Sequence, residues 1–202
     1  MQVEVVVVGG GPAGSAAAVT LARGGRSVLV VDKAHFPRDK CCGDGLTTMA
    51  LRLGKRLGLD PKTLADWQPV GAAVVHSPSG RTVRFPLPSG NGSYAAVVPR
   101  TSYDAALLDL ARSAGADVQE GCRFTSIKLT EEGVELMVEG LGEVRASNVV
   151  AADGMWSPVR RALDFPDREG RGEWLAFRQY VSGVDSQAAD VHVGVEADLL
   201  PG

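Results

Sequence analysis

Three glycines near the N-terminus have the spacing of a turn that binds a dinucleotide. Gly9, Gly11 and Gly14 form a Gly-x-Gly-x-x-Gly pattern, and Asp32 follows farther along the chain. In such a turn the first glycine permits a sharp bend, the second lets the backbone approach a pyrophosphate, and the third lets a helix pack closely on a strand. Free N–H groups at the helix N-terminus favour the phosphate charge, and an acid such as Asp32 accepts hydrogen bonds from a ribose hydroxyl. The pattern therefore predicts a site for a nucleotide with a free 2′-hydroxyl, as in FAD or NAD.

The sequence around the glycines predicts the strand, helix and strand that must position them. An apolar run at Val5–Val8 enters the turn, an alanine-rich segment spans residues 13–23, and a second apolar run covers Val28–Val31. This succession of an apolar run, an alanine-rich segment and a second apolar run is typical of a βαβ unit. On their own the glycines would indicate only a tight turn with close helix packing. The strand context and Asp32 favour the binding interpretation.

The rest of the chain predicts further helices and strands. A helix is expected from Leu46 to Leu57, and short strands between Val70 and Val98. The pair Thr101-x-x-Asp104 predicts a capping box that opens a helix running to about Ala114. Other strands are expected at 117–119, 124–129, 134–138, 144–146, 148–152, 174–184 and 191–195, with a short helix at 157–162.

Composition limits the classes of function. The 202 residues carry a net charge of −3, which does not favour a nucleic-acid partner. Three cysteines make no disulfide framework and fit a reducing cytoplasm, and the start of the chain lacks the basic region of a signal peptide. No apolar run approaches the length of a membrane span. The three histidines lack metal-ligand spacing, so no metal site is expected.

Three stretches downstream of the βαβ unit carry a family resemblance. Residues 36–46 read FPRDKCCGDGL, residues 98–104 read VPRTSYD, and residues 149–160 read VVAADGMWSPVR. Together with the glycine turn, and in this order, they resemble the geranylgeranyl reductase family, FAD-dependent enzymes of the aromatic-hydroxylase type that saturate isoprenoid double bonds. The Cys-Gly-Asp-Gly-Leu-Thr stretch is most similar to the branch that reduces the polyprenyl tail of menaquinone.

The resemblance implies an α/β fold with a Rossmann-like FAD-binding βαβ domain of the glutathione-reductase or PHBH type, into which part of a β-rich substrate domain is inserted. The FAD-binding domain is expected at 1–69 and 99–165, with a small β-meander near 118–147. The substrate domain is expected at 70–98 and 166–202. In the family a second cofactor motif lies beyond the point where this chain ends, so the resemblance also implies that a C-terminal part of the same protein is missing.

The resemblance further implies reduction of C=C bonds in a polyprenyl chain, of the geranylgeranyl or menaquinone-tail kind, by hydride from N5 of reduced flavin. In the family a cysteine at the position of Cys42 lines the cavity near the flavin, so Cys42 is the candidate catalytic residue and proton donor; a small buried hydrophobe is the other interpretation. The neighbouring Arg38 and Lys40 would favour its thiolate if they lie close. The residues expected to contact FAD are Gly9, Gly11, Pro12, Ala13, Gly14, Asp32, Lys33, Arg38, Cys42, Gly43, Arg100, Asp153 and Gly154.

The expected partners follow from the same resemblance. A polyprenyl lipid is the substrate, the electron donor is NAD(P)H or a reduced carrier protein, and the protein is cytoplasmic with transient contact to the inner face of the membrane. Two alternatives stay open on the sequence: a flavin-dependent monooxygenase or halogenase of the same fold, and a truncated flavoprotein fragment without catalysis.

Overall fold

The computed structural model describes residues 1–88, 95–166, 176–183 and 189–195. The chain divides into two compact units. The first comprises residues 1–40, 57–59 and 100–176, and the second comprises residues 41–56, 60–99 and 177–202. No helix in the described ranges is both long and apolar enough to cross a membrane.

A six-stranded mixed sheet forms the centre of the first unit, in the order β8-β2-β1-β11-β10-β9. β1 pairs in parallel with β2 and β11, and β2 pairs in parallel with β8, whereas β10 runs antiparallel to both β11 and β9. The strand bounds are β1 Gln2–Val8, β2 Val28–Asp32, β8 Asp117–Glu120, β9 Phe124–Thr130, β10 Gly133–Val138 and β11 Gly142–Ala151.

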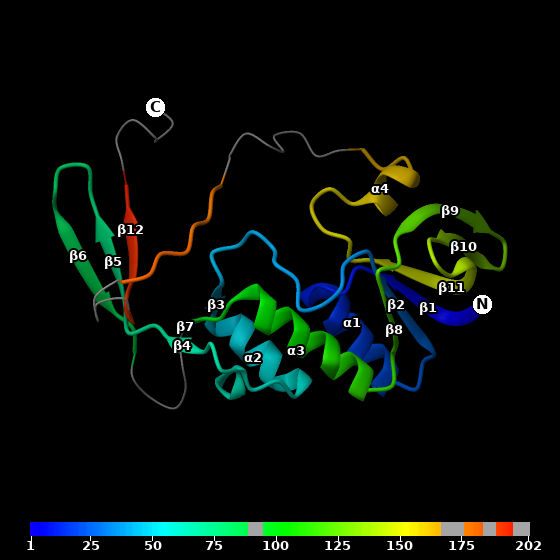
Figure 1. The fold of residues 1–202 in the computed structure, drawn as a ribbon, viewed down its shortest axis with the longest axis horizontal. Coiled ribbons are helices and arrows are strands. Elements are labelled where there is room, and N and C mark those ends of the chain that lie inside the picture. The colour runs from blue at the N-terminus through cyan, green and yellow to red at the C-terminus, as the bar shows by residue number, and fades with distance from the viewer. Residues whose placement is uncertain (89–94, 167–175, 184–188, 196–202) are drawn as a thin grey trace. The chain divides into compact units, whose positions relative to one another are not determined.

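Both faces of this sheet are buried, which explains why β1 and β2 are continuous apolar runs rather than alternating ones. Val5 and Val7 point to one face, where they pack with residues of α1 (Pro12–Arg23) and α3 (Arg100–Ser113). Val6 and Val8 point to the other face, where they pack with the β9–β11 strands and with Val159 of α4 (Pro158–Ala162). The two helices α1 and α3 lie side by side in Figure 1. This double covering holds the carboxyl ends of β1, β2 and β11 at one fixed edge.

The second unit contains two small sheets. One has the order β3-β7-β4 and the other the order β12-β5-β6. Their strands are β3 Gly45–Thr47, β4 Gln68–Pro69, β5 Ala72–His76, β6 Thr82–Pro86, β7 Ala95–Val97 and β12 Val191–Gly194, accompanied by helix α2 Thr48–Leu57 and the short 3-10 helix η1 Pro61–Thr63.

The α/β fold class and the βαβ unit are confirmed, and three local predictions are wrong. Leu46 lies in β3 rather than in a helix, because it pairs with Ala96 of β7. The strands expected at 144–146 and 148–152 are one strand, β11, because it spans β10 on one side and β1 on the other. Residues 176–183 form no strand, whereas 174, 175 and 184 lie outside the described residues.

The observed division of the chain differs from the expected domain boundaries at residues 41–56 and 60–69. These residues group with the second unit because β3 and β4 both pair with β7.

Candidate functional site

The glycine turn leaves the sheet directly after β1 and is packed against the end of β11. Gly9 has a φ of 106°, which only glycine adopts readily, and a Cβ there would lie 2.4 Å from the Ala152 carbonyl oxygen. A Cβ on Gly14 would lie 1.8 Å from the Gly9 carbonyl oxygen. The fold itself therefore requires glycine at positions 9 and 14.

Gly11 differs from the other two glycines because the packing of the chain does not require it. Its φ of −70° and ψ of −177° suit any residue, and it is the N-cap of α1, followed by Pro12 and Ala13. Within the described part of the chain, the one atom within 4 Å of a Cβ on Gly11 would be Arg38 Nη2, at 3.4 Å. The space beside Gly11 thus opens between a helix N-terminus, which favours anions, and a guanidinium group.

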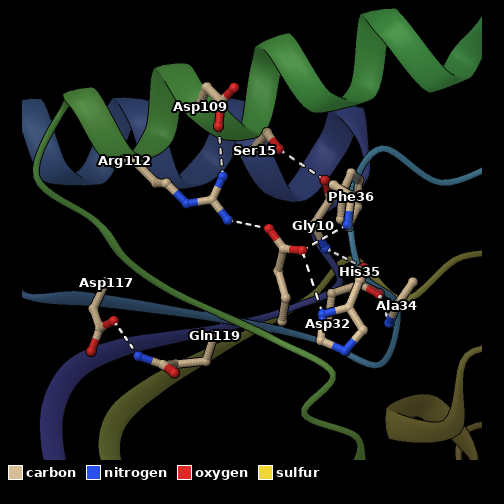
Figure 2. Close-up of polar contacts among 11 residues, drawn as sticks. Gly10, Ser15, Asp32, Ala34, His35, Phe36, Asp109, Arg112, Asp117 and Gln119 are labelled. Atoms are coloured by element: carbon tan, nitrogen blue, oxygen red, sulfur yellow. Dashed lines mark hydrogen bonds and ion pairs between the residues drawn. The ribbon is translucent and has the colours of Figure 1, made fainter.

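Asp32 closes β2 beside this turn, as Figure 2 shows. Its Oδ2 accepts a hydrogen bond from the Gly10 N–H at 2.7 Å, and its Oδ1 accepts one from the Ala34 N–H at 2.8 Å. These two bonds fix the carboxylate, and each oxygen keeps a second lone pair for a ligand hydroxyl. The Ser15 hydroxyl also donates to the Gly10 carbonyl at 3.0 Å, which holds the turn on α1.

The segment after Asp32 is anchored by Glu120, the last residue of β8. One Glu120 oxygen accepts a hydrogen bond from the Phe36 N–H at 2.6 Å, and the other pairs with Arg112, which also binds Asp109 (Figure 2). Burial raises the pKa of Glu120, but the Phe36 N–H and the Arg112 guanidinium outweigh that effect, so its pKa lies below the ordinary value of 4.5.

We expect Glu120→Gln to lower the free energy of unfolding by about 1 kcal/mol at pH 7, because the charged partner of Arg112 is lost. A pKa that is lower in the folded state than in the unfolded state stabilises the protein above the unfolded value. This stabilisation disappears as the pH falls through the folded value. The wild type should therefore lose stability below about pH 4.5 more steeply than Glu120→Gln.

Urea unfolding at pH 7 and between pH 5 and about 3.5 measures this difference. Glu139→Gln is a suitable control, since the Glu139 carboxylate is exposed and lies 3.7 Å from an exposed arginine. If the free energy of unfolding falls equally with pH in the wild type and in Glu120→Gln, the ionised Glu120 carboxylate does not stabilise the fold as proposed.

Two arginines meet a single carboxylate near the turn. Asp104, on α3, is fully buried; it accepts hydrogen bonds from Arg100 Nε and Nη2 at 2.6 and 2.7 Å, and Arg38 Nη1 lies 2.9 Å from its Oδ2. The predicted capping box is wrong, because α3 begins at Arg100 and the Asp104 carboxylate binds these guanidiniums rather than the backbone N–H of an N-cap.

A cavity of about 280 Å³ opens at the carboxyl ends of the strands, where ligands bind in open α/β sheets. It is lined by residues from the turn, from the ends of β1 and β2, from the start of β9 and from α4. These are Val8, Gly9, Val31, Asp32, Lys33, Cys122, Arg123, Phe124, Asp153, Pro158 and Arg161.

Asp153 and Gly154 follow β11 at the same edge. Asp153 Oδ2 accepts a hydrogen bond from the Val159 N–H at 2.9 Å and so holds the start of α4, while Asp153 Oδ1 is buried and has no hydrogen-bond partner among the described residues. Gly154 has a φ of 89°, which explains glycine at this position.

Comparison with known proteins identifies the ligand class of this site. The family described as "FAD binding domain" matches residues 2–197 of the chain. The chain belongs to this family. FAD is therefore the dinucleotide that the glycine turn and Asp32 imply.

Among the relatives of this FAD binding domain is a menaquinone reductase of Mycolicibacterium smegmatis, 38% identical over 90% of this chain and 44% of the relative. A digeranylgeranylglycerophospholipid reductase of Methanopyrus kandleri is 33% identical over 100% of this chain and 50% of the relative. A solved geranylgeranyl bacteriochlorophyll reductase-like structure from Thermoplasma acidophilum aligns with a TM-score of 0.71 and 28% identity, over 81% of this chain and 42% of that one. The chain thus spans about half the length of the curated relatives it matches, and the resemblance to reductases of this type is confirmed.

The residues of the first unit fit FAD on structural grounds alone. Gly11 lies at a helix N-terminus beside the Arg38 guanidinium, and both groups favour a phosphate. The buried Asp153 Oδ1 lacks a donor that a ligand hydroxyl would supply. Asp32 and Asp153 both line the cavity, as expected of a site for a nucleotide with several hydroxyl groups.

Cys42 and Gly43 lie in the second unit, in the loop before β3. The Cys42 thiol is free and partly exposed, and a Cβ on Gly43 would meet no atom of the described chain within 4 Å. Their contact with FAD stays a prediction, as do the individual contacts of all the other predicted site residues, Gly9, Gly11, Pro12, Ala13, Gly14, Asp32, Lys33, Arg38, Arg100, Asp153 and Gly154.

Sequence reasoning missed two buried acids. Asp104 was assigned to a cap, although its spacing of four residues from Arg100 is also that of a helical ion pair. Asp44 has a φ of 56° and is buried; its Oδ2 accepts a hydrogen bond from the Tyr180 hydroxyl at 2.6 Å. A bond between residues so far apart in the chain leaves no local signal. Within the described ranges, no group of three or more His, Cys, Asp or Glu side chains could hold a metal ion.

Proposed function

We propose that the protein is an FAD-dependent oxidoreductase that reduces C=C bonds in the polyprenyl chain of an isoprenoid lipid. The observation that supports this most is the match of 79–100% of the chain to two kinds of reductase, of menaquinone and of digeranylgeranylglycerophospholipid, at 32–40% identity. Solved flavoproteins of other activities share the fold but not this level of identity: the flavin-dependent monooxygenase PieE aligns at 25% with a TM-score of 0.68.

In this proposal the turn and its surroundings bind the ADP half of FAD. The N-terminus of α1 and the Arg38 guanidinium neutralise the pyrophosphate, and Asp32 accepts hydrogen bonds from the ribose. Asp153 Oδ1 accepts a hydrogen bond from another hydroxyl group. The double covering of the sheet keeps these groups in place before the ligand arrives.

When bound and reduced, FAD supplies a hydride from N5 to one carbon of the alkene. The other alkene carbon would require a proton, for which the Cys42 thiol is the candidate donor, so that hydride and proton together would convert the C=C bond into CH–CH as the reduced flavin is oxidised. Cys42 is partly exposed, so solvent can return the proton to it. NAD(P)H or a reduced carrier protein is the proposed source of electrons, and the apolar substrate implies transient contact with a membrane surface.

Anaerobic single-turnover reduction tests the proposal. The chain is loaded with FAD, reduced with dithionite, and mixed with menaquinone or a geranylgeranyl lipid, and the lipid is then analysed by mass spectrometry. The proposal predicts a mass gain of one H₂ for each reduced bond, together with reoxidation of the flavin.

Release of peroxide in air without any lipid saturation would instead indicate a monooxygenase or halogenase. Cys42→Ala and Cys41→Ala serve as matched variants, because Cys41 is the adjacent free thiol with no assigned role. We expect the first to slow lipid reduction by about tenfold to a hundredfold and the second to leave it unchanged. Equal rates in both variants would remove Cys42 from the mechanism.

A further inference from the structure

The buried carboxylate of Asp104 is shared by the two arginines that the sequence assigns to the cofactor. Its side chain has no exposed surface, while those of Arg38 and Arg100 are 17% and 19% exposed. Arg100 binds it through two hydrogen bonds from one edge of its guanidinium group. This pairing on consecutive turns of α3 fixes the carboxylate, so Asp104 is a rigid anchor rather than a mobile counter-ion.

Arg38 is held on two sides and keeps a third side open. Its Nη1 lies 2.9 Å from Asp104 Oδ2, at an angle outside the hydrogen-bond range, so that contact is an ion pair. Its guanidinium carbon lies 4.8 Å from the centre of the Phe36 ring, a cation–π contact, and Phe36 packs on the hydrophobic core.

The remaining edge of Arg38 faces the glycine turn. Nη2 would be 3.4 Å from a Cβ on Gly11, the N-cap of α1. A guanidinium has five N–H donors in a rigid plane, and Asp104 engages Nη1, whereas Nη2 is the nitrogen beside Gly11. The same plane therefore presents Nη2 to whatever anion the helix N-terminus attracts.

We propose that Asp104 is a positioning residue for FAD: it holds Arg38 so that Nη2 meets the pyrophosphate beside Gly11. The inference rests on the proposed FAD site and goes beyond it, because Asp104 contacts no part of the ligand. Its loss should therefore weaken the binding of ligands that carry a diphosphate and leave the binding of the nucleoside unchanged.

Calorimetric titration of the 202-residue chain with ADP and with adenosine tests this, since the two ligands differ by the diphosphate. For Asp104→Asn we expect the Kd for ADP to rise by about tenfold to a hundredfold, with the Kd for adenosine within about twofold of the wild type. Asp109→Asn is the matched control, because Asp109 lies on the same helix, is exposed and pairs with Arg112. It should change neither constant.

Equal weakening of ADP and adenosine would show that Asp104 only supports the fold, and an unchanged Kd for ADP would also overturn the inference. If Asp104→Asn does not fold, Arg38→Ala provides the test: it must give the same loss for ADP alone, and unchanged ADP binding contradicts the proposal. A wild-type chain that binds neither ADP nor FAD would refute the proposed site itself, which is distinguishable from both results.

Discussion

Alanine in place of Gly14 is expected to lower the free energy of unfolding by about 3 kcal/mol. The added Cβ would lie 1.8 Å from the Gly9 carbonyl oxygen and 3.2 Å from the Ala152 side chain. Neither residue can move away easily, because the Gly9 N–H donates a hydrogen bond to the Val31 carbonyl oxygen and the Ala152 N–H donates one to the Val8 carbonyl oxygen. Helix α1 would have to move away from the sheet that it covers.

Urea unfolding followed by circular dichroism measures this loss. Gly10→Ala is the matched control in the same turn, since its Cβ would meet the tips of the Leu108 and Phe36 side chains, at 3.2 and 3.4 Å, and Asp32 Oδ2 at 3.5 Å, but no backbone atom so close as the one beside Gly14. Because side chains can shift, we expect Gly10→Ala to lower the free energy of unfolding by about 1 kcal/mol or less. A Gly14→Ala protein as stable as Gly10→Ala would contradict the close contact between the turn and α1.

Alanine in place of Gly11 is expected to weaken FAD binding while leaving the protein folded, in contrast to alanine at Gly14, which lowers stability. The backbone at Gly11 suits any residue, so the cost to stability is limited to an N-cap change of about 1 kcal/mol or less. The added methyl group would occupy the space between the α1 N-terminus and Arg38 Nη2, where the pyrophosphate is proposed to bind. Crowding of about 1–3 kcal/mol corresponds to roughly tenfold to a hundredfold weaker binding.

Quenching of flavin fluorescence on binding gives the Kd for FAD, and thermal unfolding of the same samples gives the stability. Gly194→Ala is the control, because a Cβ at this exposed position of β12 would meet no described atom within 4 Å. It should change neither quantity. Unaltered FAD affinity in Gly11→Ala would mean that the ligand does not approach the turn at this glycine.

The sequence predicted the βαβ unit well because its determinants leave a local pattern of apolar runs and glycines. The apolar runs of β1 and β2 reflect burial on both faces of the sheet, and the glycines reflect contacts within the turn or with the next strand end. The position of Asp153 and Gly154 directly after β11 was also predicted, since this pair follows an apolar strand, and their contact with FAD stays a prediction.

Other features could not be predicted because their causes are distant in the chain. Leu46 was assigned to a helix by its apolar spacing, but pairing with Ala96 across the second unit places it in β3. Asp104 fits both a capping box and an i,i+4 ion pair with Arg100 by spacing, and its second partner, Arg38, comes from a distant segment. Tertiary contacts outweigh local propensity at such positions.

The claim on which the account rests is that this chain binds FAD through the ADP half, at the glycine turn. A titration of the 202-residue chain with FAD, repeated in the presence of excess ADP and then of excess riboflavin, tests it most directly. We predict saturable binding that ADP displaces and riboflavin does not. Binding that riboflavin displaces while ADP has no effect, or no binding at all, would contradict it.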